Sequence, residues 1–246
     1  MSGTHAPERP GAKPPGRLSQ ALIRLLMKRA TITASERLAD RFRLITLEGP
    51  ALKGVAWTPG HKVQIAMGSA FVARTYTPID WDASSGRTRI LAYAHGDGPG
   101  SAWVRGVRPG DSCDIFGPRA SLEMPPGPLA IFGDETSIGF AFAAVHQDRT
   151  RSVACHFEVD DVEASTAVAA HLGLDAAALF ARRPDDPHLA AMDAALPALV
   201  AAGASFVLSG KANTIQRLRQ GLKQQQLPAT RLAAKAYWAP GKTGLD

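Results

Sequence analysis

The 246-residue chain contains little cysteine, few aromatic residues and no long apolar run. Its two cysteines, Cys113 and Cys155, are far apart and form no CxxC pair, which argues against a disulfide framework or a structural zinc site. We therefore expect a reducing, cytoplasmic environment. No apolar run approaches the roughly 18 residues of a membrane-spanning helix, so we expect a soluble protein.

The chain also lacks a Ser-His-Asp arrangement and a metal-ligand pattern, so it offers no candidate for catalysis by a side chain or a resident metal. Hydrophobic residues make up 45% and charged residues 20% of the chain, which are ordinary globular values. The length predicts one large domain or two small ones.

The formal charge of +6 is concentrated near the N-terminus, where residues 1–30 hold six basic groups and one acid. The remaining residues together are nearly neutral. A basic arm of this kind can contact phosphate or an anionic membrane. No aromatic-interleaved basic face or nucleic-acid motif follows it, so we predict no nucleic-acid and no membrane partner.

Residues 1–17 are rich in proline and glycine and predict a mobile tail. From Leu18 to Leu26 the apolar residues have helical spacing, with Lys28 on the polar face. Two interpretations remain, a transit peptide and a short helix docked on the body. We favour the docked helix because no small-residue cleavage site follows.

Residues 31–116 alternate between apolar and polar positions, as in Arg41 to Leu44 and Lys62 to Met67, and are punctuated by glycine and proline turns. This pattern predicts an antiparallel barrel or sandwich. We assign residues 18–124 to this first domain.

After the proline-rich bridge at 124–128 the pattern changes to apolar strands alternating with helices. Strands are predicted at 129–132, 152–158, 205–209 and 232–238, and helices at 136–146, 162–172 and 214–223. Such alternation predicts a parallel sheet with crossover helices, so residues 125–246 form a small α/β domain.

Two clusters in the first domain carry functional chemistry. Arg74-Thr75-Tyr76-Thr77 offers a phosphate donor, an aromatic plane and a hydroxyl, which together suit a flavin nucleotide. His95 to Trp103 forms a glycine-rich turn before a short helix, whose free backbone N–H groups suit a pyrophosphate. Taken alone, the first cluster also fits an exposed edge strand, and the second a capped loop.

Together these clusters resemble the siderophore-interacting proteins, which are flavin-dependent ferric-siderophore reductases of the ferredoxin-reductase-like superfamily. The resemblance covers roughly residues 18–244. Its motifs occur in order at 74–77, 94–103, 109–111, 117–119, 133–136 and 236–241.

The resemblance implies a flavin-binding β-barrel that holds FAD, followed by a domain for NADH or NADPH. It implies that Arg74 pairs with the FAD phosphates, Tyr76 stacks on the flavin, and Thr77 bonds near N5. The further cofactor contacts that it implies are Thr75, His95, Gly96, Gly98, Gly100, Ser101, Ala102, Trp103, Gly133, Asp134, Glu135 and Thr136. Ile79 stands where the family often has a second arginine, which removes one expected phosphate contact.

The turn from Gly133 to Thr136 follows a predicted strand and is not a GxGxxG fingerprint. On its own it fits helix capping, and the resemblance implies a nicotinamide-nucleotide contact. Glu158, Asp160 and Asp161 end the next strand, where an acid accepts from a ribose 2′-hydroxyl. The negative charge of these three acids favours NADH, because it repels the 2′-phosphate of NADPH. Lys211, Arg217 and Arg219 could nevertheless receive a 2′-phosphate.

The resemblance thus implies an enzyme that reduces ferric siderophore with electrons from NAD(P)H and releases ferrous iron. Ferric chelates are often anionic, so we expect a basic rim near the flavin, with Lys62, Arg119, Lys235 and Lys242 as candidates. Tyr237 and Trp238 could shield the flavin or simply pack the sheet. The alternatives are a flavin reductase that exchanges electrons with a ferredoxin, and a module that binds without turnover.

Overall fold

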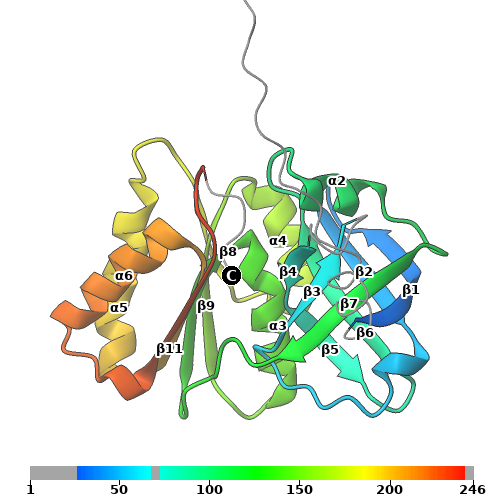
Figure 1. Ribbon diagram of the computed structural model, residues 1–246. Coiled ribbons are helices and arrows are strands. Elements are labelled where there is room, and N and C mark those ends of the chain that lie inside the picture. The colour runs from blue at the N-terminus through cyan, green and yellow to red at the C-terminus, as the bar shows by residue number, and fades with distance from the viewer. Residues whose placement is uncertain (1–26, 68–72, 242–246) are drawn as a thin grey trace, which may run out of the picture.

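The computed structural model describes residues 27–67 and 73–241, which form an antiparallel and a parallel layer side by side (Figure 1). The predicted tail and the helix predicted from Leu18 to Leu26 lie outside the described residues. Lys28, expected on the polar face of that helix, is instead the first residue of a strand. Within the described part of the chain, no helix is long and apolar enough to cross a membrane.

The first layer is a seven-stranded sheet in which all neighbouring strands are antiparallel. Its core consists of alternate apolar residues such as Ile45, Val63 and Ile115. This confirms the predicted antiparallel layer. The strand order is β4 (Ala73–Tyr76), β3 (Lys62–Ala66), β7 (Ser112–Arg119), β1 (Lys28–Arg37), β2 (Phe42–Glu48), β6 (Arg87–Tyr93) and β5 (Pro78–Asp82). Two short helices, η1 (Pro50–Leu52) and α2 (Pro99–Gly106), belong to this layer.

The second layer is the predicted parallel sheet, and it has five strands. Their order is β10 (Ala178–Ala181), β9 (Val153–Val159), β8 (Leu129–Asp134), β11 (Ser205–Lys211) and β12 (Leu232–Trp238). The chain order reverses on either side of β8, and ligands of such sheets bind beyond the carboxyl ends of the strands at this point. Both β8 and β11 are buried along their whole length, as expected for strands covered on both faces.

Four helices cover the parallel sheet (Figure 1). The helices α3 (Ile138–Gln147) and α4 (Val162–His171) lie between this sheet and the seven-stranded antiparallel sheet, which we call the barrel. The helices α5 (His188–Ala201) and α6 (Ala212–Gln224) cover the far face. The 3-10 turns η2 (Glu135–Ser137) and η3 (Ala229–Arg231) precede α3 and β12.

Sequence reasoning missed β10 and α5. The strand is only four residues long, and the helix contains Pro197 within an alanine-rich segment that lacks a polar face. The predicted domain boundary at 124/125 stays a prediction. It falls between β7 and β8.

The two layers share one apolar core through α3. Ile79 and Leu91 of the barrel belong to the same buried cluster as Phe140 and Ile131 of the second layer. Gly139 lets the helix approach closely, since a Cβ there would lie 3.0 Å from Ile79 Cγ2 and 3.2 Å from Leu91 Cβ.

We therefore predict that Gly139→Leu overpacks this interface and lowers the free energy of unfolding by about 1–3 kcal/mol. Urea denaturation measures the effect. The matched control is Gly106→Leu, because a Cβ at Gly106 meets no heavy atom within 4 Å. An equal loss of stability in both variants would contradict the proposed close packing.

Candidate functional site

The two sequence clusters of the barrel lie in contact. Gly100, at the start of α2, packs on β4, where an added Cβ would lie 3.0 Å from Arg74 Cγ and 3.6 Å from the Tyr76 hydroxyl. The rings of Tyr76 and Trp103 lie 5.7 Å apart at an angle of 43°. The structure therefore brings the Arg-aromatic strand and the glycine-rich turn into one place.

Arg74 is half-buried and has unused hydrogen-bonding capacity. Its guanidinium donates to the carbonyl of Ala73 at 2.8 Å, and it makes no ion pair with the described residues. A planar guanidinium in this state suits a phosphate, which accepts two parallel hydrogen bonds.

The turn before α2 is held by its own hydrogen bonds. Ser101, one of the cofactor contacts implied by the resemblance, is 6% exposed and donates to the carbonyl of His95 at 2.8 Å. Gly98 caps the helix without a side-chain bond, and a Cβ at Gly96 or Gly98 would meet nothing within 4 Å. An uncapped helix start with open space around it fits a phosphate group.

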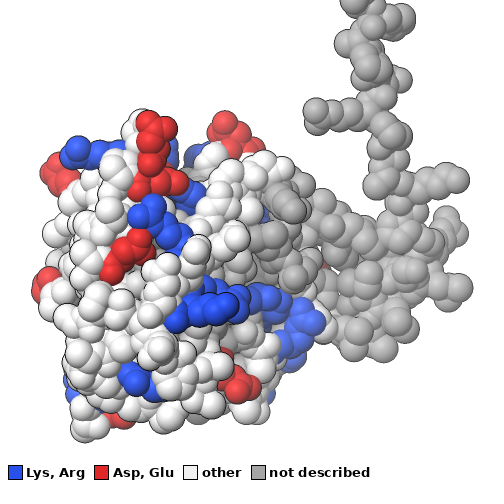
Figure 2. All heavy atoms as spheres, turned by 90° about the vertical axis from the view of Figure 1, so that its left-hand side faces the viewer, with Lys and Arg blue, Asp and Glu red and all other residues white. Residues whose placement is uncertain are grey.

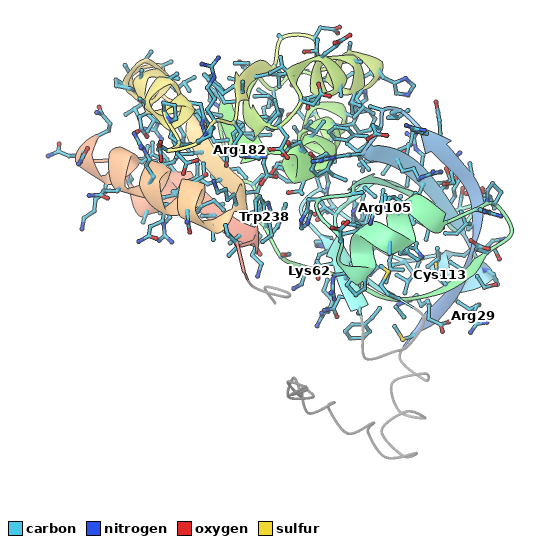
Figure 3. All side chains as sticks on the ribbon, turned by 90° about the horizontal axis from the view of Figure 1, so that it is seen from above. Arg29, Lys62, Arg105, Cys113, Arg182 and Trp238 are labelled. Carbon is cyan, nitrogen blue, oxygen red and sulfur yellow. The ribbon has the colours of Figure 1, made fainter. Side chains whose placement is uncertain are left out.

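The glycine-rich turn meets the second layer through Trp238. The His95 ring stacks on the Trp238 ring with centroids 5.4 Å apart. Trp238 Nε1 donates to Asp134 Oδ2 at 2.7 Å. Figure 3 shows Trp238 near Arg182, and the Arg182 guanidinium lies 6.0 Å from the centre of the Trp238 ring. Trp238 thus connects the barrel to the corner between β8 and α3.

That corner contains the predicted nucleotide residues Gly133 to Thr136. A Cβ at Gly133 would lie 2.3 Å from Ser137 Oγ, so only glycine fits. Asp134 is fully buried, and it accepts from the Thr136 amide at 2.9 Å and from the Thr136 hydroxyl. Burial raises the pKa of Asp134 to about 6, and the hydrogen bonds from Thr136 and Trp238 limit the rise.

Glu135 also points into the protein rather than to solvent. Its carboxylate accepts from the Asp160 amide at 2.6 Å and pairs with Arg182 at 3.0 Å. Both acids of the corner are therefore engaged internally, and the backbone is the part of this corner that remains to contact a nucleotide.

Arg182, which sequence reasoning missed, is the centre of an acidic cluster at the ends of β8 to β10. It pairs with Glu135, with Glu158 at 3.4 Å and with Asp160. Burial alone would lower its pKa, but these carboxylates outweigh burial and raise it. No motif marks this arginine, because its partners are distant in sequence.

The expectation that Glu158 faces a ribose is wrong. Glu158 is fully buried, where it accepts from the Thr214 hydroxyl and bonds His188 Nε2 at 2.9 Å. Asp160 is held by Arg182 and by Arg41, which lies 3.3 Å away.

Asp161 is likewise engaged, since it caps α4 through the amide of Ala164. Lys211 pairs with Asp186 at 3.4 Å and Arg217 with Asp193 at 2.7 Å, so two of the three bases considered for a 2′-phosphate also have acidic partners. The charges of these residues therefore give no preference for NADH.

Tyr237 links the predicted flavin threonine to the second layer. Its hydroxyl lies near the side chains of Thr77 and Ser209, and burial raises the pKa of Tyr237. Ser209 Oγ in turn donates to Ser137 Oγ at 2.8 Å. Hydroxyl groups of both layers therefore lie close together at Thr77.

Two of the four residues predicted to form a basic rim are neighbours in the structure, and the rim itself stays a prediction. Lys62 and Arg119 are cross-strand partners on β3 and β7, and Figure 3 shows Lys62 on the side of the barrel that faces Trp238. Arg119 donates to Gln64 at 3.0 Å and lies over the Phe116 ring.

Lys235, the rim candidate from the second layer, lies on β12. It shares one face of β12 with Tyr237, because side chains alternate along a strand, and that face turns toward Thr77 and the barrel. Lys242 lies outside the described residues.

Comparisons with known proteins agree with this arrangement. Residues 64–122 match the family model of the siderophore-interacting FAD-binding domain. This segment includes both barrel clusters, and the match confirms the resemblance to siderophore-interacting proteins. No curated protein sequence matches the chain.

Solved structures share the whole fold. A siderophore utilization protein from T. fusca has 21% identity and a TM-score of 0.70, with 89% of this chain and 95% of that chain covered. The siderophore-interacting protein SipS from Aeromonas hydrophila has 21% identity and a TM-score of 0.74, covering 88% and 93%. The ferredoxin reductase in carbazole 1,9a-dioxygenase has 16% identity and a TM-score of 0.70, covering 86% and 69%.

The fold is therefore that of the ferredoxin-reductase-like FAD and nucleotide-binding proteins. The family match supports FAD as the cofactor and an oxidoreductase as the class of protein. The unpaired Arg74 and the open, uncapped start of α2 fit the phosphates of such a cofactor.

The buried Asp134 generates a prediction about pH. Its pKa is about 6 in the folded protein and about 4 in an unfolded chain, so the folded state binds more protons between these values. Asp134 therefore contributes to the free energy of unfolding at about pH 4, and this contribution is lost as the pH rises to about 6. The loss amounts to up to about 3 kcal/mol.

Urea unfolding of the wild type and of Asp134→Asn between about pH 4 and pH 6 measures this loss of stability. The wild-type free energy of unfolding, relative to the variant, should fall as the pH rises. Asp161→Asn makes the same chemical change at an exposed helix cap and serves as the control. A wild-type-to-Asp134→Asn difference that does not change with pH would contradict the raised pKa.

Proposed function

We propose that the protein is an FAD-dependent oxidoreductase that reduces ferric siderophore with electrons from NAD(P)H and thereby releases ferrous iron. The observation that carries the proposal is the family match over residues 64–122, which contains Arg74 to Thr77 and the turn from His95 to Trp103. These two segments are in contact in the structure.

In this proposal residues 18–124 hold FAD and residues 125–246 bind the nicotinamide nucleotide. Arg74 holds the FAD phosphates, together with the backbone at the start of α2. Tyr76 provides an aromatic surface for the flavin ring, and Thr77 presents a hydroxyl near that of Tyr237.

The reaction requires little acid–base chemistry from the protein. One NAD(P)H supplies two electrons and leaves as NAD(P)⁺ with release of one proton, so it reduces two ferric ions to ferrous ions. Bound FAD supplies the ability to accept a hydride and to pass electrons on one at a time. Ferrous iron is a softer cation that hard oxygen ligands hold less firmly than ferric iron, so reduction loosens the chelate.

The protein's own part is to bind and orient. The corner at Gly133 to Thr136 presents its backbone to the nicotinamide nucleotide, since the Asp134 and Glu135 carboxylates are engaged within the fold. Lys62, Arg119, Lys235 and Lys242 attract the anionic chelate to the open side of the flavin.

A second donor is a ferredoxin or another protein that carries electrons. The inward orientation of Glu158 bears only on the choice between NADH and NADPH, and what favours a protein donor is the likeness of the fold to a solved reductase of this kind. One of the similar structures is itself a ferredoxin reductase.

We predict that Arg74→Ala weakens FAD binding about 10- to 100-fold, because hydrogen bonds to a charged phosphate contribute about 1.5–3 kcal/mol. Fluorescence titration of apoprotein with FAD measures the affinity. The matched control is Arg89→Ala in β6 of the same sheet, because Arg89 is already bound to Asp80. Equal FAD affinity in wild type and Arg74→Ala would contradict the assigned role.

We predict that changing Lys62, Arg119 and Lys242 together to alanine raises the KM for a ferric hydroxamate about 10-fold or more. Loss of attractive charge weakens binding of an anion, and added salt should reduce the difference. FAD affinity should not change. The control replaces three other barrel bases, Lys53, Arg87 and Arg108, and an unaltered KM in the first variant would refute the basic rim.

A further inference from the structure

Acids line the end of the parallel sheet where the nucleotide is proposed to bind. Glu135, Glu158 and Asp160 share one cation there, because the guanidinium nitrogens of Arg182 are all engaged by these carboxylates. Seen from the side of α5 and α6, Asp and Glu gather mainly at the top of the molecule, with Lys and Arg among them (Figure 2). A nucleotide brings negatively charged phosphates, so its site needs a cation that these acids have not taken.

Lys211 is a cation at this end of the sheet with a different environment. It is the last residue of β11, which pairs with β8 beside the point where the strand order reverses. The register between β11 and β12 shifts between Gly210 and Lys211, so that Lys211 is the partner of Trp238. Lys211 therefore lies next to the corner where Trp238 binds Asp134, and ligands of such sheets bind at this point.

The backbone that leads to Lys211 is held against the same corner. Gly210 has a φ of 100°, and a Cβ there would lie 2.4 Å from Asp134 Oδ2, so only glycine fits. Asp134 is itself fixed by hydrogen bonds from Trp238 and Thr136. The start of the Lys211 side chain thus has a fixed position beside the proposed nucleotide.

The ammonium group of Lys211 is nearly buried and has spare hydrogen-bond donors. Its side chain is 10% exposed, and within the described residues Nζ donates to Asp186 Oδ1 at 3.4 Å. An ammonium group has three donors, and its bonds to carboxylates are usually about 2.7–2.9 Å long. Lys211 therefore has a long bond to one acid and capacity for a further anionic oxygen.

Asp186 is a loosely held counterion. Its side chain is 41% exposed, and it lies in the turn between β10 and α5, where Asp185 and Asp186 have φ values of 63° and 52°. Left-handed backbone is uncommon for residues other than glycine, so the turn adopts a less favourable conformation. Solvent reaches the acid, and another anion can replace it on Lys211.

A phosphate is the anion that suits this position. It has several acceptor oxygens and forms strong hydrogen bonds with charged donors. The proposed nucleotide brings phosphates to this end of the sheet, since NADH and NADPH both contain a pyrophosphate and NADPH also has a 2′-phosphate.

We propose that Lys211 binds a phosphate of the nicotinamide nucleotide, and that Asp186 holds the ammonium group until the nucleotide replaces it. This inference rests on the proposed function, because it concerns the nucleotide that residues 125–246 are proposed to bind.

The test measures binding of NAD⁺ and NADP⁺ to the full-length protein loaded with FAD, by isothermal titration calorimetry. Lys211→Met removes the ammonium group, and Lys223→Met makes the same change at an exposed position of α6. Lys211→Met should bind nucleotide about 10-fold more weakly or worse. Lys223→Met should change the affinity by less than about 2-fold, since solvent and salt screen its charge.

The two nucleotides distinguish the two kinds of phosphate. Equal weakening of NAD⁺ and NADP⁺ binding would assign Lys211 to the pyrophosphate, whereas weakening of NADP⁺ binding alone would assign it to the 2′-phosphate. Unchanged affinity for both nucleotides in Lys211→Met, or an equal loss in Lys223→Met, would overturn the proposal.

A second variant tests the role of Asp186 even if Lys211→Met folds poorly. Asp186→Asn removes the competing charge, and asparagine tolerates the same left-handed backbone. It should bind the nucleotide about 3- to 10-fold more tightly, a gain that damage to the fold does not produce. Asp185→Asn makes the same change at the neighbouring left-handed residue and should alter the affinity by less than about 2-fold. An Asp186→Asn variant that binds nucleotide no more tightly than the wild type would contradict the role of Asp186.

Failure of the proposed function is scored separately. Flavin reduced by dithionite is mixed with a ferric hydroxamate, a reaction that needs no nucleotide, and a flavin that stays bleached would refute ferric reduction whatever the role of Lys211. A wild type whose flavin is reoxidised in this way but which binds neither nucleotide would overturn the Lys211 site and leave ferric reduction standing.

Discussion

The buried carboxylate of Asp134 determines how the rest of the site is arranged. It stands at the end of β8, where the order of the parallel sheet reverses, and it accepts hydrogen bonds from Trp238 on the last strand and from Thr136 at the start of η2. A buried acid is costly unless its oxygens are bonded, so these partners are fixed in position. Trp238 then stacks on His95 of the barrel, and the two layers are joined beside the proposed flavin.

The same junction explains why the site belongs to both layers. Arg74 and Tyr76 come from the barrel, but the Thr77 side chain lies near Tyr237 of the second layer, close to the hydrogen-bonded pair of Ser209 and Ser137. Close packing of α3 against the barrel at Gly139 fixes the separation between the two layers. A change at the interface is therefore expected to alter the flavin pocket.

Local patterns in the sequence sufficed for the class of fold and for the barrel clusters. Alternation in β3 and the apolar runs of β8 and β11 are local signals, and the structure confirms the antiparallel and parallel sheets. Sequence reasoning could not predict which side chains interact when they are far apart in the sequence. Arg182 is separated by 47 residues from Glu135, and the inward turn of Glu158 depends on Thr214, 56 residues away.

The central claim is that this chain binds a flavin that passes electrons to ferric iron. It is tested most directly by the visible spectrum of the protein with FAD, recorded without oxygen before and after NADH or NADPH and then after a ferric hydroxamate. The account predicts a bound flavin that bleaches with the reductant and regains its yellow band when the ferric chelate is added. A protein that binds no flavin, or a bleached flavin that the ferric chelate does not reoxidise, would contradict it.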